Sequence, residues 1–119
     1  MPFSSKPIVT IIGSRSITAL NLSLYIDPNH CGTIITGGAT GVDTIAENWA
    51  KANKLEYLIF KPNYNTCGKK APLVRDEDMV KACDIVIAFW DGKSHGTAYT
   101  LKYCEEIGRK YICHLVNDL

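Results

Sequence analysis

Five short apolar runs constrain most strongly what this chain can fold into. They occupy residues 8–12, 33–36, 57–60, 85–90 and 111–116, and they are rich in β-branched and aromatic side chains. Strands that are apolar on both faces are typical of a parallel sheet that is covered on both sides. The stretches between the runs have helical spacing, so strands and helices alternate. The sequence therefore predicts an α/β fold, a single Rossmann-like three-layer sandwich with a parallel five-stranded sheet.

Apolar stripes place the helices between these strands. Residues 42–53 are predicted to form one helix, with a stripe at Val42, Ile45, Ala46, Trp49 and Ala50. A second helix is predicted to end at Gly108, and a third to carry Pro72 in its first turn. Residues 17–24 predict a weaker helix, and residues 61–70 a long irregular loop.

Length and composition indicate an ordinary globular domain. The 119 residues are 46% hydrophobic and 21% charged, so we expect one domain over residues 1–119. Thirteen Lys and Arg against twelve Asp and Glu leave a formal charge of +1. Binding that depends on phosphate contacts usually requires a basic excess, so this balance disfavours nucleic acid as a partner.

Cysteine usage and the N-terminus favour a cytoplasmic protein. The five cysteines are an odd number and form no C-x-x-C pair, which indicates free thiols in a reducing compartment. No apolar run approaches the ~20 residues that cross a bilayer, and no secretory signal is visible at the start. The three histidines lie in separate segments, so we predict no metal site and no cofactor.

Three glycine-bearing loops follow the first, second and fourth predicted strands. They are residues 13–16, 37–43 and 91–97, and the last two lead into helices. Ligands of open parallel sheets bind at the carboxyl ends of the strands. Glycines allow close approach of the backbone to an anion, and helix N-termini bind phosphate. Three such loops at one edge predict a ligand that carries phosphate.

Several familiar motifs match these loops only in part. Residues 37–41 read G-G-x-x-G after the second strand, which is not the dinucleotide fingerprint. Residues 92–94 end like a phosphate loop, but Ile87 stands where its upstream glycine is required. Residues 92–96 satisfy G-x-S-x-G, yet His114 and Asp118 follow in the wrong order for a serine hydrolase.

The combined motifs resemble those of the SLOG superfamily, and most closely its small YspA-like members. The resemblance rests on residues 11–15, on residues 36–43, and on the segment from Arg75 through Asp84 to Thr97. It implies a Rossmann-like fold that binds nucleotides or nucleotide-derived ligands such as ADP-ribose. It also implies a homodimer or higher homo-oligomer.

A distant branch of the superfamily, the LOG phosphoribohydrolases, shares part of this pattern. Arg75, Met79, Asp84, Gly96 and Thr97 resemble its motif. Thr100 stands where that branch has a glutamate, and threonine cannot supply a carboxylate for glycosidic cleavage. Weak catalytic candidates that could replace it or assist are Asp43, Arg75, Asp91 and Glu105.

The candidate ligand-binding residues come from the three loops and from the helix that contains Arg75. They are Gly13, Ser14, Arg15, Gly37, Gly38, Ala39, Gly41, Asp43, Arg75, Asp91, Ser94, His95, Gly96 and Thr97. Arg15 could hold a phosphate in a forked contact. Trp90 and Tyr99 could stack on a base or belong to the core.

These observations favour a module that binds a nucleotide-derived small molecule, of the ADP-ribose or nucleoside-phosphate type, as a sensor, carrier or sequestering protein. Two alternatives stay open. One is an N-glycosidic hydrolase of nucleoside phosphates, and the other is a structural or protein-interaction domain whose ligand site has decayed.

Overall fold

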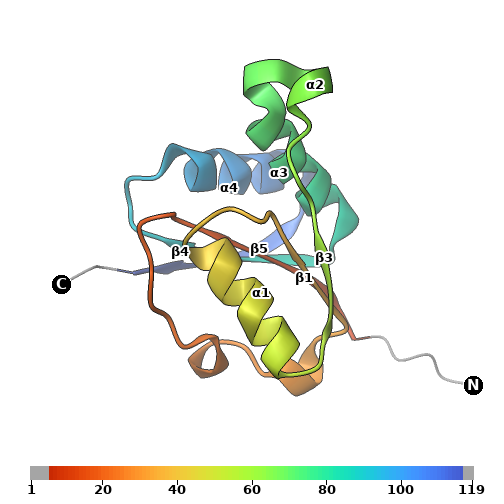
Figure 1. Cartoon of the computed structure of the whole chain (residues 1–119), viewed down its shortest axis with the longest axis vertical. Helices are drawn as coiled ribbons and strands as arrows, with labels where there is room; N and C mark the ends of the chain where they lie inside the picture. The colour runs from red at the N-terminus through yellow and green to blue at the C-terminus, as the bar shows by residue number, and fades with distance from the viewer. Residues whose placement is uncertain (1–5, 117–119) are drawn as a thin grey trace, which may run out of the picture.

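A five-stranded parallel sheet forms the middle layer of the computed structural model, which describes residues 6–116 (Figure 1). The strands are β1 (Ile8–Gly13), β2 (Thr33–Thr36), β3 (Glu56–Ile59), β4 (Ile85–Trp90) and β5 (Lys110–Leu115). Their order across the sheet is β3-β2-β1-β4-β5, and every neighbouring pair is parallel. The chain therefore reverses direction across the sheet between β1 and β4, which places a topological switch point at their carboxyl ends.

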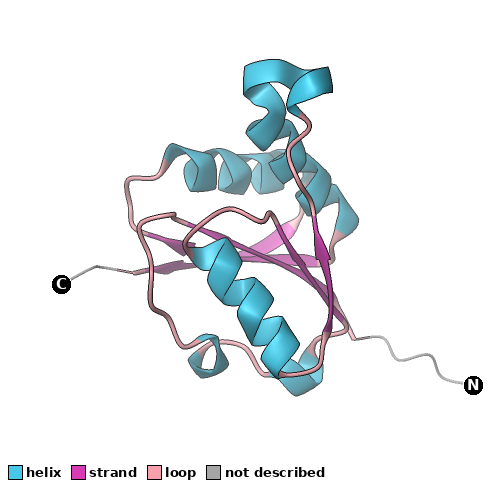
Figure 2. Cartoon of the chain, viewed as in Figure 1, coloured by secondary structure: helices cyan, strands magenta, loops and turns pink. Residues whose placement is uncertain are grey.

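Helices cover both faces of the sheet (Figure 2). Helix α1 (Val42–Ala52) packs on one face, and its buried Val42, Ala46 and Ala50 join a core cluster with Val9 and Phe89. Helices α3 (Ala71–Ala82) and α4 (His95–Ile107) cover the other face. There, Met79 and Cys104 join a second cluster with residues of β1, β2 and β4. The predicted three-layer α/β fold is confirmed.

Local sequence signals account for the helix ends. Pro72 lies in the first turn of α3, where a missing N–H costs nothing. Gly108 ends α4 in the left-handed conformation, with φ 75° and ψ 25°, and its N–H closes the last turn. Both boundaries agree with the sequence prediction.

Two predicted segments differ from the structure. The weaker helix over residues 17–24 is absent, and that stretch contains only a 3-10 turn at Leu22–Leu24. Asn21 caps this turn through its side chain, and Leu24 is 77% exposed, so the apolar spacing does not mark a buried face. The predicted loop over residues 61–70 instead holds the short helix α2 (Tyr64–Cys67) and a 3-10 turn at Gly68–Lys70.

The five cysteines are free thiols, and Cys31, Cys83 and Cys104 are buried. Burial raises the pKa of each of these three thiols, to about 11 for Cys104, so they act as small apolar side chains. Among residues 6–116, no helix has the length and apolar character that a membrane span requires.

Trp49 provides a test of the α1 packing. Its ring is partly buried against the first core cluster, and its indole N–H donates to Ser23 Oγ at 2.9 Å. Trp49→Ala is expected to lower the free energy of unfolding by about 3 kcal/mol, measured by urea denaturation. Trp49→Phe keeps most of the packing and should lose only about 1 kcal/mol. An unchanged midpoint for the alanine variant would show that α1 does not depend on this ring.

Candidate functional site

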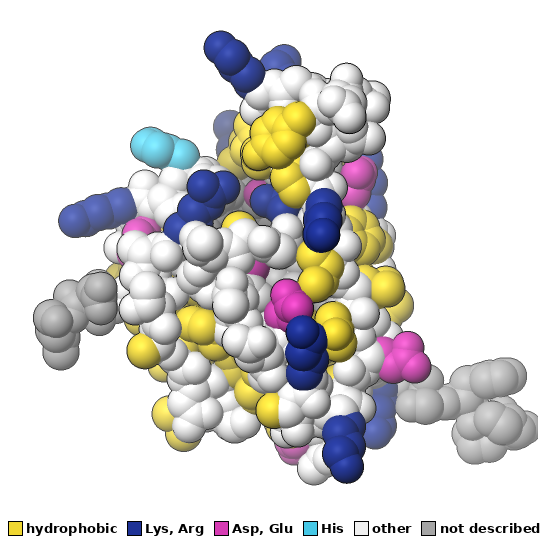
Figure 3. All heavy atoms as spheres, in the orientation of Figure 1, with side chains coloured by type: hydrophobic (Ala, Val, Ile, Leu, Met, Phe, Trp, Pro, Cys, Tyr) yellow, Lys and Arg dark blue, Asp and Glu magenta, His cyan; other side chains and the backbone are white. Residues whose placement is uncertain are grey.

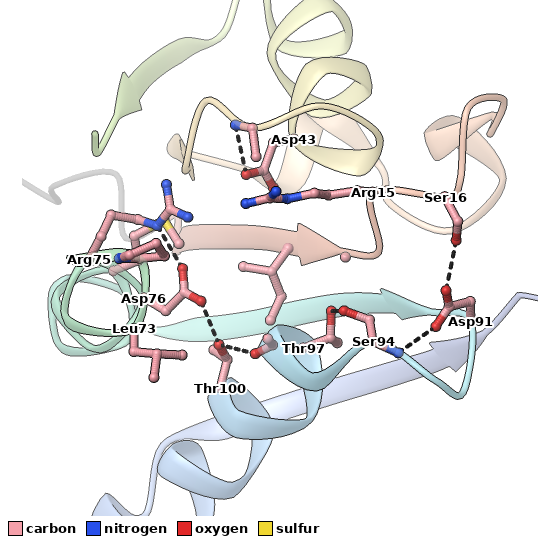
Figure 4. Close-up of a pocket in the computed structure, with 16 residues that line it drawn as sticks. Arg15, Ser16, Asp43, Leu73, Arg75, Asp76, Asp91, Ser94, Thr97 and Thr100 are labelled. Atoms are coloured by element: carbon pink, nitrogen blue, oxygen red, sulfur yellow. Dashed lines mark hydrogen bonds and ion pairs between the residues drawn. The ribbon is translucent and has the colours of Figure 1, made fainter. Parts of the chain in front are cut away.

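The three predicted loops meet at the carboxyl ends of β1, β2 and β4, next to the switch point. They surround a cavity of about 300 Å³ into which side chains from β1, α1, α3 and α4 project (Figure 4). Its lining residues are Ile12, Gly13, Arg15, Ser16, Ala39, Asp43, Pro72, Leu73, Arg75, Asp76, Met79, Asp91, Ser94, Gly96, Thr97 and Thr100. We call it the first cavity.

A second cavity of about 290 Å³ adjoins the first, and the two share Arg15, Ala39, Pro72 and Arg75. The remaining lining of this second cavity is Gly37, Gly38, Thr40, Pro62 and Tyr64. We refer to the two adjoining cavities together as the hollow, and Tyr64 of α2 lines its second cavity.

The buried side chain of Arg75 links three segments of the chain by hydrogen bonds. The side chain is 8% exposed, and its Nε donates to Asp76 Oδ1 at 2.7 Å. Its Nη1 donates to the carbonyl of Gly37 and, at 3.3 Å, to that of Phe60. Arg75 therefore fixes the loop after β2 and the end of β3 to α3, and it lines both cavities.

Asp43 holds the glycine loop after β2 in place. The residue is 6% exposed, and its Oδ2 accepts the Ala39 N–H at 3.1 Å. Burial raises the pKa of Asp43, although the Ala39 N–H and the Arg75 guanidinium act in the opposite direction. Gly37 is required beside it, because a Cβ there would lie 2.6 Å from Arg75 Nη1.

Asp76 and Thr100 face each other across the first cavity, on α3 and α4. The Thr100 hydroxyl lies 3.1 Å from Asp76 Oδ2 and 2.9 Å from the Gly96 carbonyl, and its single proton serves one of them at a time. Burial raises the pKa of Asp76, opposed chiefly by Arg75. Asp76 was not among the candidates from the sequence, because only the packing of α3 beside α4 brings it to Thr100.

Asp91 shapes the loop after β4. It accepts the Ser16 hydroxyl at 2.7 Å and the N–H groups of Lys93 and Ser94, each at 2.8 Å. These donors, with Ser16 the strongest, hold the pKa of Asp91 below its usual range. The Asp91 N–H in turn donates to Ser14 Oγ at 2.9 Å. A carboxylate so well supplied with donors is a weak base, which disfavours a proton-transfer role.

Arg15 lines the same two cavities as Arg75 but differs from it in exposure and in its partners. It is exposed, its side chain points into the first cavity, and it also lines the second (Figure 4). Within residues 6–116, no carboxylate lies within 4.0 Å of its guanidinium. Arg15 is therefore a cation available to an incoming group.

The other candidates divide into lining and supporting residues. Gly13, Ser94, Gly96 and Thr97 line the first cavity, and Gly37 and Gly38 line the second. Ser14 and Gly41 do not line a cavity; Gly41, at φ 77°, passes so close to Arg15 that a Cβ would lie 2.6 Å from its Cα.

Four candidates face elsewhere. Neither cavity is lined by His95 or Glu105, which are exposed on α4. The Trp90 indole donates to the Ser94 carbonyl at 2.9 Å, so it braces the loop. The Tyr99 hydroxyl donates to Glu77 on the outside of α3 and α4. The expectation that Trp90 or Tyr99 flanks a base has no support in this arrangement.

Comparison with known proteins identifies relatives by sequence. A model of the YspA, cpYpsA-related SLOG family matches residues 26–66. This match, over about a third of the chain, supports the SLOG, YspA-like assignment made from the loop motifs. The Gene 61 protein of Mycobacterium phage D29 is 33% identical over 81 residues, which are 63% of this chain and 65% of the phage protein.

Two solved structures share the fold. DNA processing protein A of Streptococcus pneumoniae superposes with a TM-score of 0.73 at 18% identity, covering 92% of this chain and 50% of the other. The Helicobacter pylori protein of that name, which binds single-stranded DNA, superposes with a TM-score of 0.70 at 20% identity, covering 91% and 65%. This chain matches less than two-thirds of the length of each of these three relatives.

These neighbours contradict the function expected from the sequence. We expected a nucleotide-derived small molecule as the ligand and considered nucleic acid an unlikely partner; the neighbours of this fold point to DNA instead. The expectation was wrong because a formal charge of +1 sums over the whole chain, whereas a strand meets only the charges at one edge of the sheet. The homodimer or higher homo-oligomer implied by the resemblance stays a prediction.

The hydrogen bonds and the ion pair of Arg75 predict a large loss of stability when its guanidinium is removed. Arg75→Met would leave Asp43 and Asp76 buried without their guanidinium, which is expected to cost about 3 to 5 kcal/mol in urea denaturation at pH 7. At pH 5 the loss should be smaller, because carboxyls with raised pKa values then take up protons. Lys81→Met, at an exposed position on the same helix, is the control and should change little. Equal losses in both variants would remove Arg75 from this role.

The raised pKa of Asp43 predicts the pH dependence of stability. The folded protein binds this proton more tightly than the unfolded chain, so the free energy of unfolding falls as the pH rises from 3.8 through the folded pKa. Asp43→Asn keeps an acceptor for the Ala39 N–H and should flatten this decline as the pH rises from 3.8. Urea denaturation across that range measures it, and an unchanged slope would contradict the assignment. Asp91→Asn is a control in which the pH dependence has the opposite sign. The lowered pKa of Asp91 adds stability above pH 3.8, and this stability is lost on acidification.

Proposed function

We propose that this member of the SLOG superfamily binds single-stranded DNA along the carboxyl edge of its sheet. The observation that carries the proposal is Arg15, an exposed guanidinium with no carboxylate at ion-pair distance among the described residues, at the junction of two adjoining cavities. The shared fold with DNA processing protein A supports the choice of DNA.

A phosphodiester is the group that Arg15 suits best. A planar guanidinium binds two oxygens of a phosphate at once, and it keeps its charge at every physiological pH. Arg75 cannot take this role, because its donors already serve Asp76 and the carbonyls of Gly37 and Phe60.

Backbone donors add to this cation at the first cavity. Helix α4 has no side-chain cap at Ser94, so the N–H groups of its first turn remain available beside Gly96 and Thr97. A Cβ at Gly96 would meet nothing within 4 Å, so the approach to this turn is open. A phosphate between Arg15 and this turn would meet the guanidinium on one side and the partial positive charge of the helix N-terminus on the other, although Asp43, Asp76 and Asp91 also line this cavity.

Basic side chains extend this positive region around the rim. Lys61 is exposed next to Pro62, Lys69 and Lys70 are exposed three and two residues before Pro72, and Lys93 is exposed next to Ser94. Figure 3 shows Lys and Arg side chains on and below the α2 segment at the top of the molecule. Several cations close in sequence to the cavity linings favour a strand, which has successive phosphates, over a ligand with one phosphate.

Each cavity is of a size for a nucleotide unit and too small for a duplex. A single strand can place one phosphate at Arg15 and a base in an adjoining cavity, whereas the paired bases of a duplex cannot enter cavities of this size. The hollow therefore favours single-stranded over double-stranded DNA. We also propose that residues 1–119 act as one domain, in a reducing cytoplasm that preserves its free thiols.

Arg15→Ala is expected to weaken binding of a 20-nucleotide oligo-dT by about 1.5 to 3 kcal/mol, the usual size for a charge-assisted hydrogen bond. Fluorescence anisotropy measures the dissociation constant. The slope of log K against log salt should also fall by about 0.7, because the variant neutralises one phosphate fewer.

Lys81→Ala is the matched control for that experiment. Lys81 is exposed near the end of α3, at the opposite edge of the sheet, and its removal changes net charge by the same amount. Equal effects of the two substitutions would mean that binding follows net charge alone and would refute the site. A wild-type protein that binds no oligonucleotide would refute the function.

A further inference from the structure

The second cavity contains an aromatic side chain that folding does not explain. Tyr64 is 58% exposed, and it belongs to neither buried core cluster of the described residues. It opens the short helix α2, which stands above the sheet edge (Figure 1). The exposed face of an aromatic ring at the wall of a cavity is available for packing against a ligand.

The backbone that carries the Tyr64 ring is held in a defined conformation. Asn63 caps α2, since its side chain accepts the Thr66 N–H at 3.2 Å and its carbonyl accepts the Cys67 N–H at 2.9 Å. Pro62 and Pro72 line the cavity beside Tyr64 and restrict the backbone on either side of the α2 segment. The backbone at Tyr64 is therefore ordered without a ligand.

The rest of the cavity leaves room for a flat group against this ring. The loop after β2 contributes Gly37 and Gly38, which have no side chain, and Gly38 adopts a φ of 74° that other residues rarely take. Backbone amides of this loop and the ring of Tyr64 thus line one space. A planar nucleobase has faces for stacking and edges for hydrogen bonds to amides.

The two cavities differ in the charged residues that line them. The first has three carboxylates in its lining, Asp43, Asp76 and Asp91. The second has Arg15 and Arg75 and no carboxylate among its described lining residues. An anionic strand would therefore meet fewer carboxylates in the lining of the second cavity than in that of the first.

We propose that Tyr64 is the stacking platform for one nucleobase of the bound strand, whose neighbouring phosphate is held by Arg15. The inference rests on the proposed function and adds the residue that contacts the base. Tyr64 and Arg15 line the same cavity, so one nucleotide can reach both. Stacking requires only the face of a ring, so the site accepts all four bases with modest preferences.

The test compares Tyr64→Ala and Tyr64→Phe on two strands of equal length, an oligo-dT and a strand of abasic sites. Tyr64→Ala should weaken binding of oligo-dT about 5- to 150-fold, the range for removal of one stacked base, and Tyr64→Phe should stay within about twofold of wild type. On the abasic strand, all three proteins should bind equally. Tyr99→Ala is the matched control, because Tyr99 is also exposed but lies outside both cavities.

Each contrary outcome identifies what has failed. If wild type binds oligo-dT in an Arg15-dependent manner and Tyr64→Ala binds it equally well, the stacking role is wrong and the proposed function stands. If Tyr64→Ala weakens both strands alike, the ring contacts the backbone and stacking is again wrong. If wild type binds neither strand, the proposed function fails and this inference with it. A thermal midpoint for Tyr64→Ala equal to that of wild type shows that the fold is intact, and Tyr64→Leu gives a second variant with retained bulk.

Discussion

The buried guanidinium of Arg75 holds the functional edge of this protein together. One side chain joins the loop after β2, the end of β3 and helix α3, and it balances two buried carboxylates, Asp43 and Asp76. A buried charge is tolerated only where its donors are satisfied and its counter-ions are close. The positions of the glycine loop and of α3 are therefore coupled, and both cavities depend on that coupling.

Arg75 and Arg15 have different roles in this arrangement. Arg75 is fixed by its partners and shapes the walls, whereas Arg15 is exposed and faces the space between them. From sequence alone both were candidates for a phosphate. Only burial and hydrogen bonding distinguish a residue that builds the site from one that is available to a ligand.

The sequence predicted what depends on local pattern. Strand runs, the stripe of α1, Pro72 in α3 and Gly108 after α4 are set by neighbours along the chain, and the structure agrees with them. It also predicted that three loops meet at one edge, because parallel strands end together. Asp76 and Tyr64 could not be found this way. Their places depend on how α3 and the α2 segment pack beside the sheet, which no spacing along the chain encodes.

The carboxylates of the first cavity have a consequence for how long a strand would stay. Asp43, Asp76 and Asp91 share a lining with Arg15, so a phosphate drawn to the guanidinium is also repelled from the walls around it. Because the same phosphate is attracted by the guanidinium and repelled by the carboxylates, its binding free energy is small. Weak binding of this kind gives a fast dissociation rate. Under the proposed function, such an edge would make brief, repeated contacts with a strand, and its occupancy would depend on the concentration of strands more than on the affinity for any one of them.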